Sequence, residues 1–174
     1  MDLSDRLRKL ATGLQASRAI DAPFPTVAPA PGDPEEARRH ELLGILEVMF
    51  LMAAVDGEIS DDEADQLEAS VAALMDMGLL GDATFADTLN ELNGRLAEEG
   101  WAARLEAATS RIRTPENRTF AFRVAATVAF VDDFVASAEA AAIESLAGKL
   151  ALDREESQGL LREVHGLLFG ERPR

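Results

Sequence analysis

Cysteine and tyrosine are absent from this 174-residue sequence, tryptophan occurs once, and aromatic residues make up only 5%. Without cysteine, disulfides and thiolate metal sites are excluded, which fits a reducing compartment. Runs of Val, Ile and Thr are short while alanine and leucine dominate, a composition that favours helices over strands. No apolar run is long enough to cross a bilayer as a helix, and the start MDLSDRLRKLATGLQ lacks the apolar core of a signal peptide. We therefore expect a soluble, cytoplasmic protein without a transmembrane segment.

Catalytic motifs are also missing. The sequence contains no glycine-rich phosphate loop, no nucleophile elbow and no HExxH motif, so we predict that the protein is not an enzyme. A metal-dependent hydrolase with paired carboxylates ranks last among the hypotheses, because no base or nucleophile motif accompanies the acids. The only histidines, His40 and His165, are expected at the surface or at helix ends, and Trp101 is expected to anchor the core.

The net charge of −15 is unevenly distributed. The stretch from Glu41 to Glu99 carries 15 acidic residues and one basic residue, whereas the first 40 residues balance at six of each. Such a field repels the phosphates of nucleic acids and attracts cations or basic protein surfaces. A general gain in solubility is the plainer interpretation. Four arginines cluster near residue 115: Arg111, Arg113, Arg118 and Arg123. They could face an acidic partner or a phosphate, but the favoured interpretation is a solvated face that also offsets the acidic half of the chain.

The chain divides into three regions. Residues 1–20 predict a short amphipathic helix over 3–19, whose leucine face consists of Leu3, Leu7, Leu10 and Leu14. Residues 21–34 hold five of the seven prolines and predict an extended linker. Residues 35–170 predict a single helical domain.

Helical periodicity recurs throughout that domain, and no strand pattern occurs beside it. The predicted helices cover 35–55, 61–77, 82–98, 101–112, 115–131, 137–149 and 153–168. Thr114 and Pro115 mark one helix start, with Thr at the N-cap and Pro in the first turn. The apolar stripes predict the core positions Leu42, Leu43, Leu46, Met49, Phe50, Ala53, Leu67, Val71, Leu74, Phe85, Leu89, Leu92, Leu96, Trp101, Leu105, Ile112, Phe120, Val124, Val128, Ile143, Leu146, Leu160, Leu161, Val164 and Leu168. The fold class is therefore all-α, a compact bundle of about seven helices.

An internal repeat with a shift of 76 residues relates two parts of the domain. The segment AAVDGEISDDEADQLE (53–68) aligns with AFVDDFVASAEAAAIE (129–144). Each copy reads as an apolar helix, an acidic turn and a second helix, which predicts two pseudo-repeated helical hairpins. An Asp and a Glu seven residues apart recur in both copies, as Asp56 and Glu63 and then as Asp132 and Glu139.

The first acidic turn has two interpretations. With Gly57 at the sixth position of an EF-hand loop, Asp56 and Glu63 take the fifth and twelfth positions, but the first and third positions are apolar. Only the second half of such a loop is present, so a complete EF-hand is not expected. Alternatively, Ser60 and Glu63 form a capping box and Gly57 ends the preceding helix, with no role in binding.

The second copy favours a ligand role over a cap. Ala136 replaces the capping Ser60 and cannot cap a helix, yet Asp132 and Glu139 are retained. The alternative is that Asp133 caps the second helix in another register. Oxygen ligands without histidine or cysteine favour Ca²⁺, Mg²⁺ or Mn²⁺.

The pattern A-x-D-G-x-I-S-x-x-E at residues 54–63, with a degenerate second copy at 130–139, resembles the tellurite-resistance TerB family and the wider TerB-like superfamily. The resemblance covers about residues 36–168, and Asp133 and Phe134 depart from the usual turn residues. It implies a compact seven-helix bundle with an acidic cluster that binds divalent metal ions, and no catalytic activity.

Carried over by position, the metal ligands implied by the resemblance are Asp56, Glu63, Asp132 and Glu139. Further candidates are Glu58, Asp61, Asp62 and Asp133. The implied role is a stress-response module with a protein partner, in the cytoplasm or peripherally at the inner face of the membrane in a stress complex. The alternative is a metal-free adaptor whose acidic face docks a basic partner protein.

Overall fold

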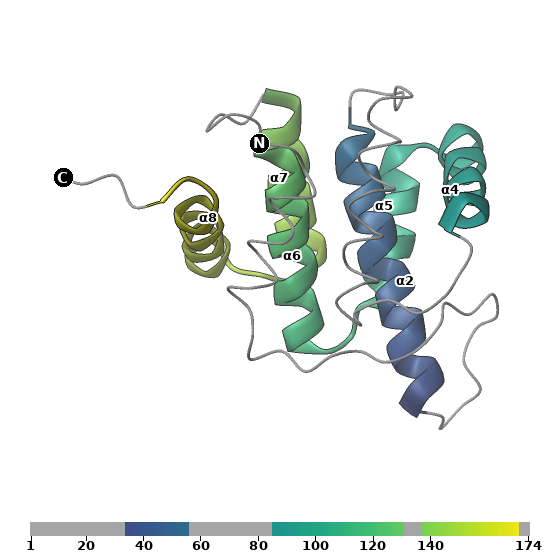
Figure 1. Cartoon of the computed structure of the whole chain (residues 1–174), viewed down its shortest axis with the longest axis horizontal. Helices are drawn as coiled ribbons and strands as arrows, with labels where there is room; N and C mark the ends of the chain where they lie inside the picture. Colours follow the sequence, from purple (N-terminus) through teal and green to yellow (C-terminus); the bar gives the residue numbers. More distant parts are fainter. Residues whose placement is uncertain (1–33, 56–84, 131–136, 171–174) are drawn as a thin grey trace.

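The computed structural model describes residues 34–55, 85–130 and 137–170, which form six helices and contain no strand (Figure 1). The helices are α2 (Pro34–Ala53), α4 (Phe85–Glu99), α5 (Trp101–Arg111), α6 (Pro115–Ala129), α7 (Ser137–Lys149) and α8 (Arg154–Phe169). The all-α prediction is confirmed for this part of the chain. The predicted helices over 3–19 and 61–77 and the linker over 21–34 lie outside the described residues.

The helix α2 lies at the centre of the described bundle. Its predicted stripe is buried at Leu42, Leu46, Met49 and Phe50, but Val48, Leu51 and Met52 on its other sides are buried as well. A helix that is apolar all round is covered by neighbours on all sides. The sequence pattern therefore identified one face of α2, and the packing buries nearly the whole circumference of its later part, from Glu41 onward.

The other helices pack around α2 in a simple order. Both α5 and α6 pack directly on α2, α4 packs on the outer side of α5, and α7 and α8 pack on α6 (Figure 1). Most predicted core positions of these helices are buried: Leu92, Leu105, Ile112, Val124, Val128, Ile143, Leu146, Val164 and Leu168. Others are only partly buried, namely Leu43 and Ala53 on α2 and Leu89, Leu96, Trp101, Phe120, Leu160 and Leu161 on the outer helices. Leu67, Val71 and Leu74 lie outside the described residues. Phe122, which the periodicity did not single out, is completely buried in α6.

Hydrogen bonds join α2, two turns after its first residue, to the start of α6. One carboxylate oxygen of Glu41 on α2, Oε2, accepts from the Thr114 hydroxyl at 2.9 Å, the Thr114 backbone N–H at 3.2 Å and the Asn117 side-chain amide at 2.8 Å. From these contacts α2 runs 12 residues to Ala53 and α6 runs 15 residues to Ala129, about 18 and 22 Å at the α-helical rise. Both helices therefore end at the same edge of the bundle, the upper edge in Figure 1.

The helix ends follow from local chemistry. Gly100 separates α4 from α5 with φ of 81°, a backbone region that glycine adopts without steric cost. Asp153 and Glu156 form a complete capping box at the start of α8. Pro115 is in the first turn of α6, as predicted, and Thr114 is at its N-cap. The Thr114 side chain makes no capping hydrogen bond, and its hydroxyl donates to Glu41.

None of the described helices is long and apolar enough to cross a membrane.

Candidate functional site

The predicted metal ligands fall mostly outside the described residues. Asp56, Glu63 and Asp132 are not described, nor are the further candidates Glu58, Asp61, Asp62 and Asp133. Glu139 is half-buried in the first turn of α7. Within the described ranges, no three His, Asp or Glu side chains gather in a way that could hold a metal ion. The ligand set therefore stays a prediction.

The helices that lead into the two acidic segments are described. They end at Ala53 and Ala129, the residues that the repeat aligns, and Asp56 and Asp132 each follow three residues later. The end of α2 is fixed by Trp101, whose indole Nε1–H donates to the Leu51 carbonyl at 2.8 Å. This bond satisfies one of the carbonyls that a helix C-terminus leaves without an internal partner. Trp101 also packs against the core, as predicted.

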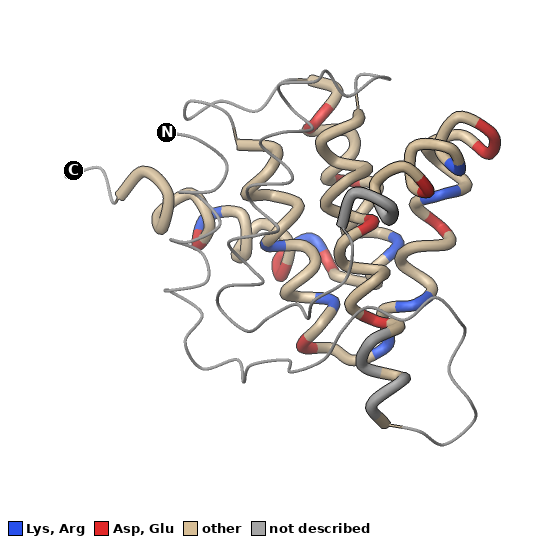
Figure 2. Tube along the Cα trace, turned by 45° about the vertical axis from the view of Figure 1, so that its right-hand side comes forward, with Lys and Arg blue, Asp and Glu red and all other residues tan. Residues whose placement is uncertain are grey.

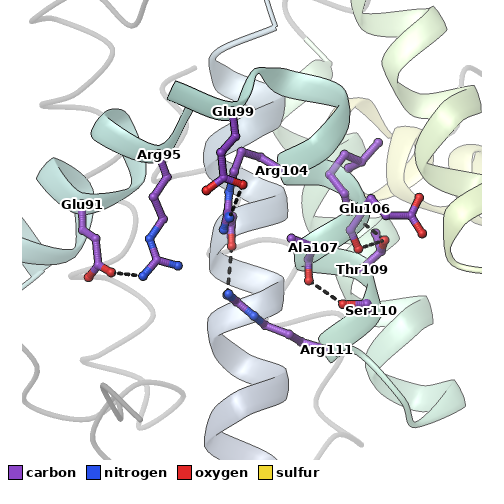
Figure 3. Close-up of polar contacts among 11 residues, drawn as sticks. Glu91, Arg95, Glu99, Arg104, Glu106, Ala107, Thr109, Ser110 and Arg111 are labelled. Carbon is purple, nitrogen blue, oxygen red and sulfur yellow. Dashed lines mark hydrogen bonds and ion pairs between the residues drawn. The ribbon is translucent and has the colours of Figure 1, made fainter. Parts of the chain in front are cut away.

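A buried ion-pair network, which the sequence reasoning missed, joins α2 to α5. The Glu47 side chain is only 1% exposed, and its Oε1 accepts from two nitrogens of Arg104, Nε at 2.7 Å and Nη2. Its other oxygen accepts from Arg111 Nη1 at 2.9 Å. The remaining Nη1 of Arg104 donates to Glu99 at 3.1 Å. Figure 3 shows Arg104 and Arg111 reaching from α5 toward α2.

The charge of the buried Arg104 depends on Glu47 and Glu99. Burial alone lowers the pKa of Arg104, but hydrogen bonds and charge from Glu47 and Glu99 outweigh it and raise that pKa. The guanidinium therefore stays protonated in the core. A sequence signal for this site exists: Glu47 is the only charged residue between positions 42 and 55. Its partners are 57 and 64 residues away in the sequence, so no local pattern identifies them.

The four arginines near residue 115 do not form one solvated face. Arg111 binds the buried Glu47, and Arg123 on α6 pairs with Glu163 on α8 at 2.8 Å. Arg118 donates through Nε to the Ile112 carbonyl at 3.3 Å, and Arg113 is exposed. Three of the four are thus used in internal contacts, and the prediction of a shared basic face was wrong.

His40 lies half-buried on α2, close to the positive charges at the end of α5. Burial and the charges of Arg111 and Arg113 lower its pKa below the ordinary value of 6.5, while Glu41 acts weakly in the opposite direction. The folded state therefore binds a proton at His40 less readily than the unfolded chain does.

We expect His40 to make stability depend on pH. Its contribution is fully present above about pH 6.5, and it is lost as the pH falls from there through the lower pKa of the folded state. Urea unfolding at pH 7.5 and 5.5 measures the effect, with His40→Asn as the non-titrating reference. Wild type should lose more stability than the variant on acidification, and equal losses would show that His40 does not contribute.

His165 lies next to the end of α6. Its ring is 5.7 Å from that of Phe130, which follows α6 directly, and 5.0 Å from that of Phe169. The sequence placed His165 far from the acidic motifs, but the fold brings it against Phe130, two residues before Asp132. A packing role explains the ring contacts, because edge-to-face aromatic pairs stabilise helix contacts beyond the area they bury.

Charge is distributed differently in the described and undescribed parts of the chain. Acidic and basic positions alternate over the described helices, as Figure 2 shows. Residues 56–84, outside the described ranges, carry nine acidic and no basic residues. Most of the acidic excess therefore belongs to the segment that contains the first acidic turn.

No protein-family model matches this chain, and neither a curated protein nor a solved structure matches it.

Proposed function

We propose that the protein is a non-enzymatic module that binds a divalent metal ion through its two acidic turns. The ligands would be Asp56 and Glu63 from the first turn and Asp132 and Glu139 from the second. The observation that carries the proposal is the common edge at which α2 and α6 end, at the aligned residues Ala53 and Ala129. In this arrangement the two hairpins of the repeat would be a pseudo-symmetric pair.

Chain geometry supports this proposal. Asp56 follows Ala53 and Asp132 follows Ala129 by three residues each, a span of about 10 Å even when fully extended. Glu139 lies two residues into α7, which packs on α6. Carboxylates that start from neighbouring helix ends would repel one another without a counter-ion. A divalent cation with all-oxygen ligation removes that repulsion, and Ca²⁺, Mg²⁺ or Mn²⁺ suits such ligands.

The resemblance to the TerB family supports a proposal for the role of the protein in the cell. It suggests a stress-response module, related to tellurite resistance, that works in the cytoplasm or peripherally at the inner face of the membrane with a protein partner. In this role the metal would stabilise the packing of the two hairpins and so the surface offered to the partner.

Thermal unfolding with and without a chelator tests metal binding. A ligand that binds only the folded state adds about 2.7 kcal/mol of stability at one hundred times its Kd. Trp101 is the only tryptophan and the chain has no tyrosine, so its fluorescence reports unfolding next to the end of α2. We expect Ca²⁺, Mg²⁺ or Mn²⁺ to raise the melting temperature of chelator-treated protein. An unchanged melting temperature with all three ions would refute metal binding.

The second candidate function is a metal-free adaptor that docks a basic partner. The nine acidic and no basic residues of segment 56–84 favour it. This function predicts no stabilisation by cations and a binding of basic protein surfaces that weakens steeply with salt. The same thermal measurement therefore separates the two candidates.

A further inference from the structure

The helices α2 and α6 end at equivalent backbone hydrogen bonds. At the end of α2, the Ala54 N–H donates to the Phe50 carbonyl at 3.0 Å. At the end of α6, the Phe130 N–H donates to the Ala126 carbonyl at 2.9 Å. The two donors are 76 residues apart and so are the two acceptors, which is the shift of the internal repeat. The chain therefore leaves both helices at the same position relative to the Asp that follows.

Different side chains hold these two ends. At the end of α6, the Phe130 ring packs against the rings of His165 and Phe169 from α8. At the end of α2, the contact is a hydrogen bond, in which the Trp101 indole Nε1–H from α5 donates to the Leu51 carbonyl at 2.8 Å. The first acidic turn thus follows a helix end that a polar side chain of another helix holds.

The indole takes the place of a backbone donor. In a helix that continued, the Leu51 carbonyl would accept from the N–H of Val55. Among the described residues, its donor at this end is the Trp101 indole instead. This bond satisfies a carbonyl that a helix C-terminus leaves without an internal partner, so α2 can end there. The point at which α2 ends decides the exit direction of the chain, since each further helical residue would turn it by about 100°.

Trp101 is itself held in a defined position. It begins α5 directly after Gly100, and its ring packs against the core. Arg104, one turn later on α5, binds Glu47, which lies one turn before Leu51 on α2. The two contacts are therefore on neighbouring turns of both helices, as expected for helix faces that oppose each other. The indole N–H consequently has a fixed direction toward the last turn of α2.

We infer that Trp101 is a positioning residue of the proposed metal site, and this inference rests on the proposed function. Its bond to Leu51 fixes the end of α2, and with it the point from which the chain leaves toward Asp56. A prearranged turn binds an ion more tightly, because less conformational freedom is lost on binding. The coupling is reciprocal, so a bound ion strengthens the indole bond as much as the bond strengthens ion binding.

Two tryptophan analogues isolate the indole N–H. Trp101 is the only tryptophan, so an analogue is incorporated at this position alone. A ring-fluorinated tryptophan keeps the N–H, whereas benzothienylalanine has the same bicyclic shape with a sulfur atom in its place. In calorimetric titrations with Ca²⁺, Mg²⁺ and Mn²⁺, the fluorinated protein should bind as wild type does. The benzothienyl protein should bind about threefold to tenfold more weakly, the loss expected for one hydrogen bond. Trp101→Phe, which also lacks the donor, should weaken binding by at least as much.

Ile112→Val is the control for a general loss of stability. Ile112 is buried directly after the opposite end of α5, about 16 Å along the helix from Trp101. The loss of one buried methyl group and the loss of one hydrogen bond destabilise proteins to a similar extent. This variant should therefore match the benzothienyl protein in thermal unfolding, but it should bind the ion as wild type does. The fluorine NMR signal of the fluorinated protein should shift when the ion binds.

The outcomes separate this inference from the proposed function. Absence of ion binding in wild type would overturn both. Equally tight binding by wild type and the benzothienyl protein would overturn the role of Trp101 and leave the metal site itself in place. Equal weakening in Ile112→Val, or an unchanged fluorine signal in protein that binds the ion, would overturn that role in the same way.

Discussion

Glu47→Ala should destabilise the protein by about 3–5 kcal/mol, the range typical for removal of one partner from a buried ion pair. Arg104 is 4% exposed, and two of its nitrogens would lose their acceptor inside the core. Arg111 would lose its partner as well. Urea unfolding followed by far-UV circular dichroism measures the loss.

Two comparisons make this prediction specific. Glu91→Gln removes a carboxylate from the exposed pair with Arg95 on α4, and it should cost less than about 1 kcal/mol. The double variant Glu47→Leu/Arg104→Leu removes both buried charges, so it should recover much of the stability that Glu47→Ala loses. If Glu47→Ala cost no more than Glu91→Gln, the buried network would not hold α2 against α5.

Gly44→Ala should also destabilise the protein, by roughly 1–2 kcal/mol net, although alanine favours helices. A Cβ atom at position 44 would lie 2.7 Å from the backbone carbonyl oxygen of Ala108 and 3.0 Å from Ile112. A backbone oxygen cannot rotate away, so α2 and α5 would have to separate. The same unfolding measurement gives the change.

Gly94→Ala is the matched control. Gly94 is exposed in the middle of α4, and nothing lies within 4 Å of an added Cβ. This substitution should stabilise the protein by about 0.5–1 kcal/mol through helix propensity alone. The two Gly→Ala changes should thus have opposite signs. A stabilising Gly44→Ala would mean that α2 and α5 pack less closely than the structure indicates.

Much of the described fold could be predicted from the sequence. The six described helices agree with predicted ones to within a few residues, because each has helical periodicity and a recognisable boundary, such as Gly100 or Pro115. Periodicity reports one face of a helix at a time. It therefore identified Leu46 and Met49 but not the opposite side of α2, whose burial depends on how many neighbours surround it.

Polar contacts were harder to predict, since they depend on residues far apart in the sequence. Thr114 has the residue type and position of an N-cap, but its side chain makes no capping bond, and its hydroxyl donates to Glu41, 73 residues earlier. Arg111 belongs to a basic run, but Glu47 on another helix binds it in the core. Of the four predicted ligands only Glu139 is described, so the repeat remains the basis for that set.

The ends of α2 and α6 agree with the alignment of the repeat. Residues Ala53 and Ala129, aligned from sequence alone, are the last residues of two helices that pack together and end at one edge. Glu41 joins α2 to the start of α6, and Trp101 binds the last turn of α2, through contacts that no repeat pattern specifies. The common edge is what makes a shared site for the two turns sterically reasonable.

Calorimetric titration of the chelator-treated protein with Ca²⁺, Mg²⁺ and Mn²⁺ tests the proposed metal site most directly. Wild type should bind at least one of these ions, and Asp56→Ala/Glu63→Ala should abolish or strongly weaken that binding. The control Glu98→Ala/Glu116→Ala, which removes two exposed carboxylates from α4 and α6, should bind as wild type does. Absence of binding in wild type, or equal binding in both double variants, would contradict a metal site in the acidic turns.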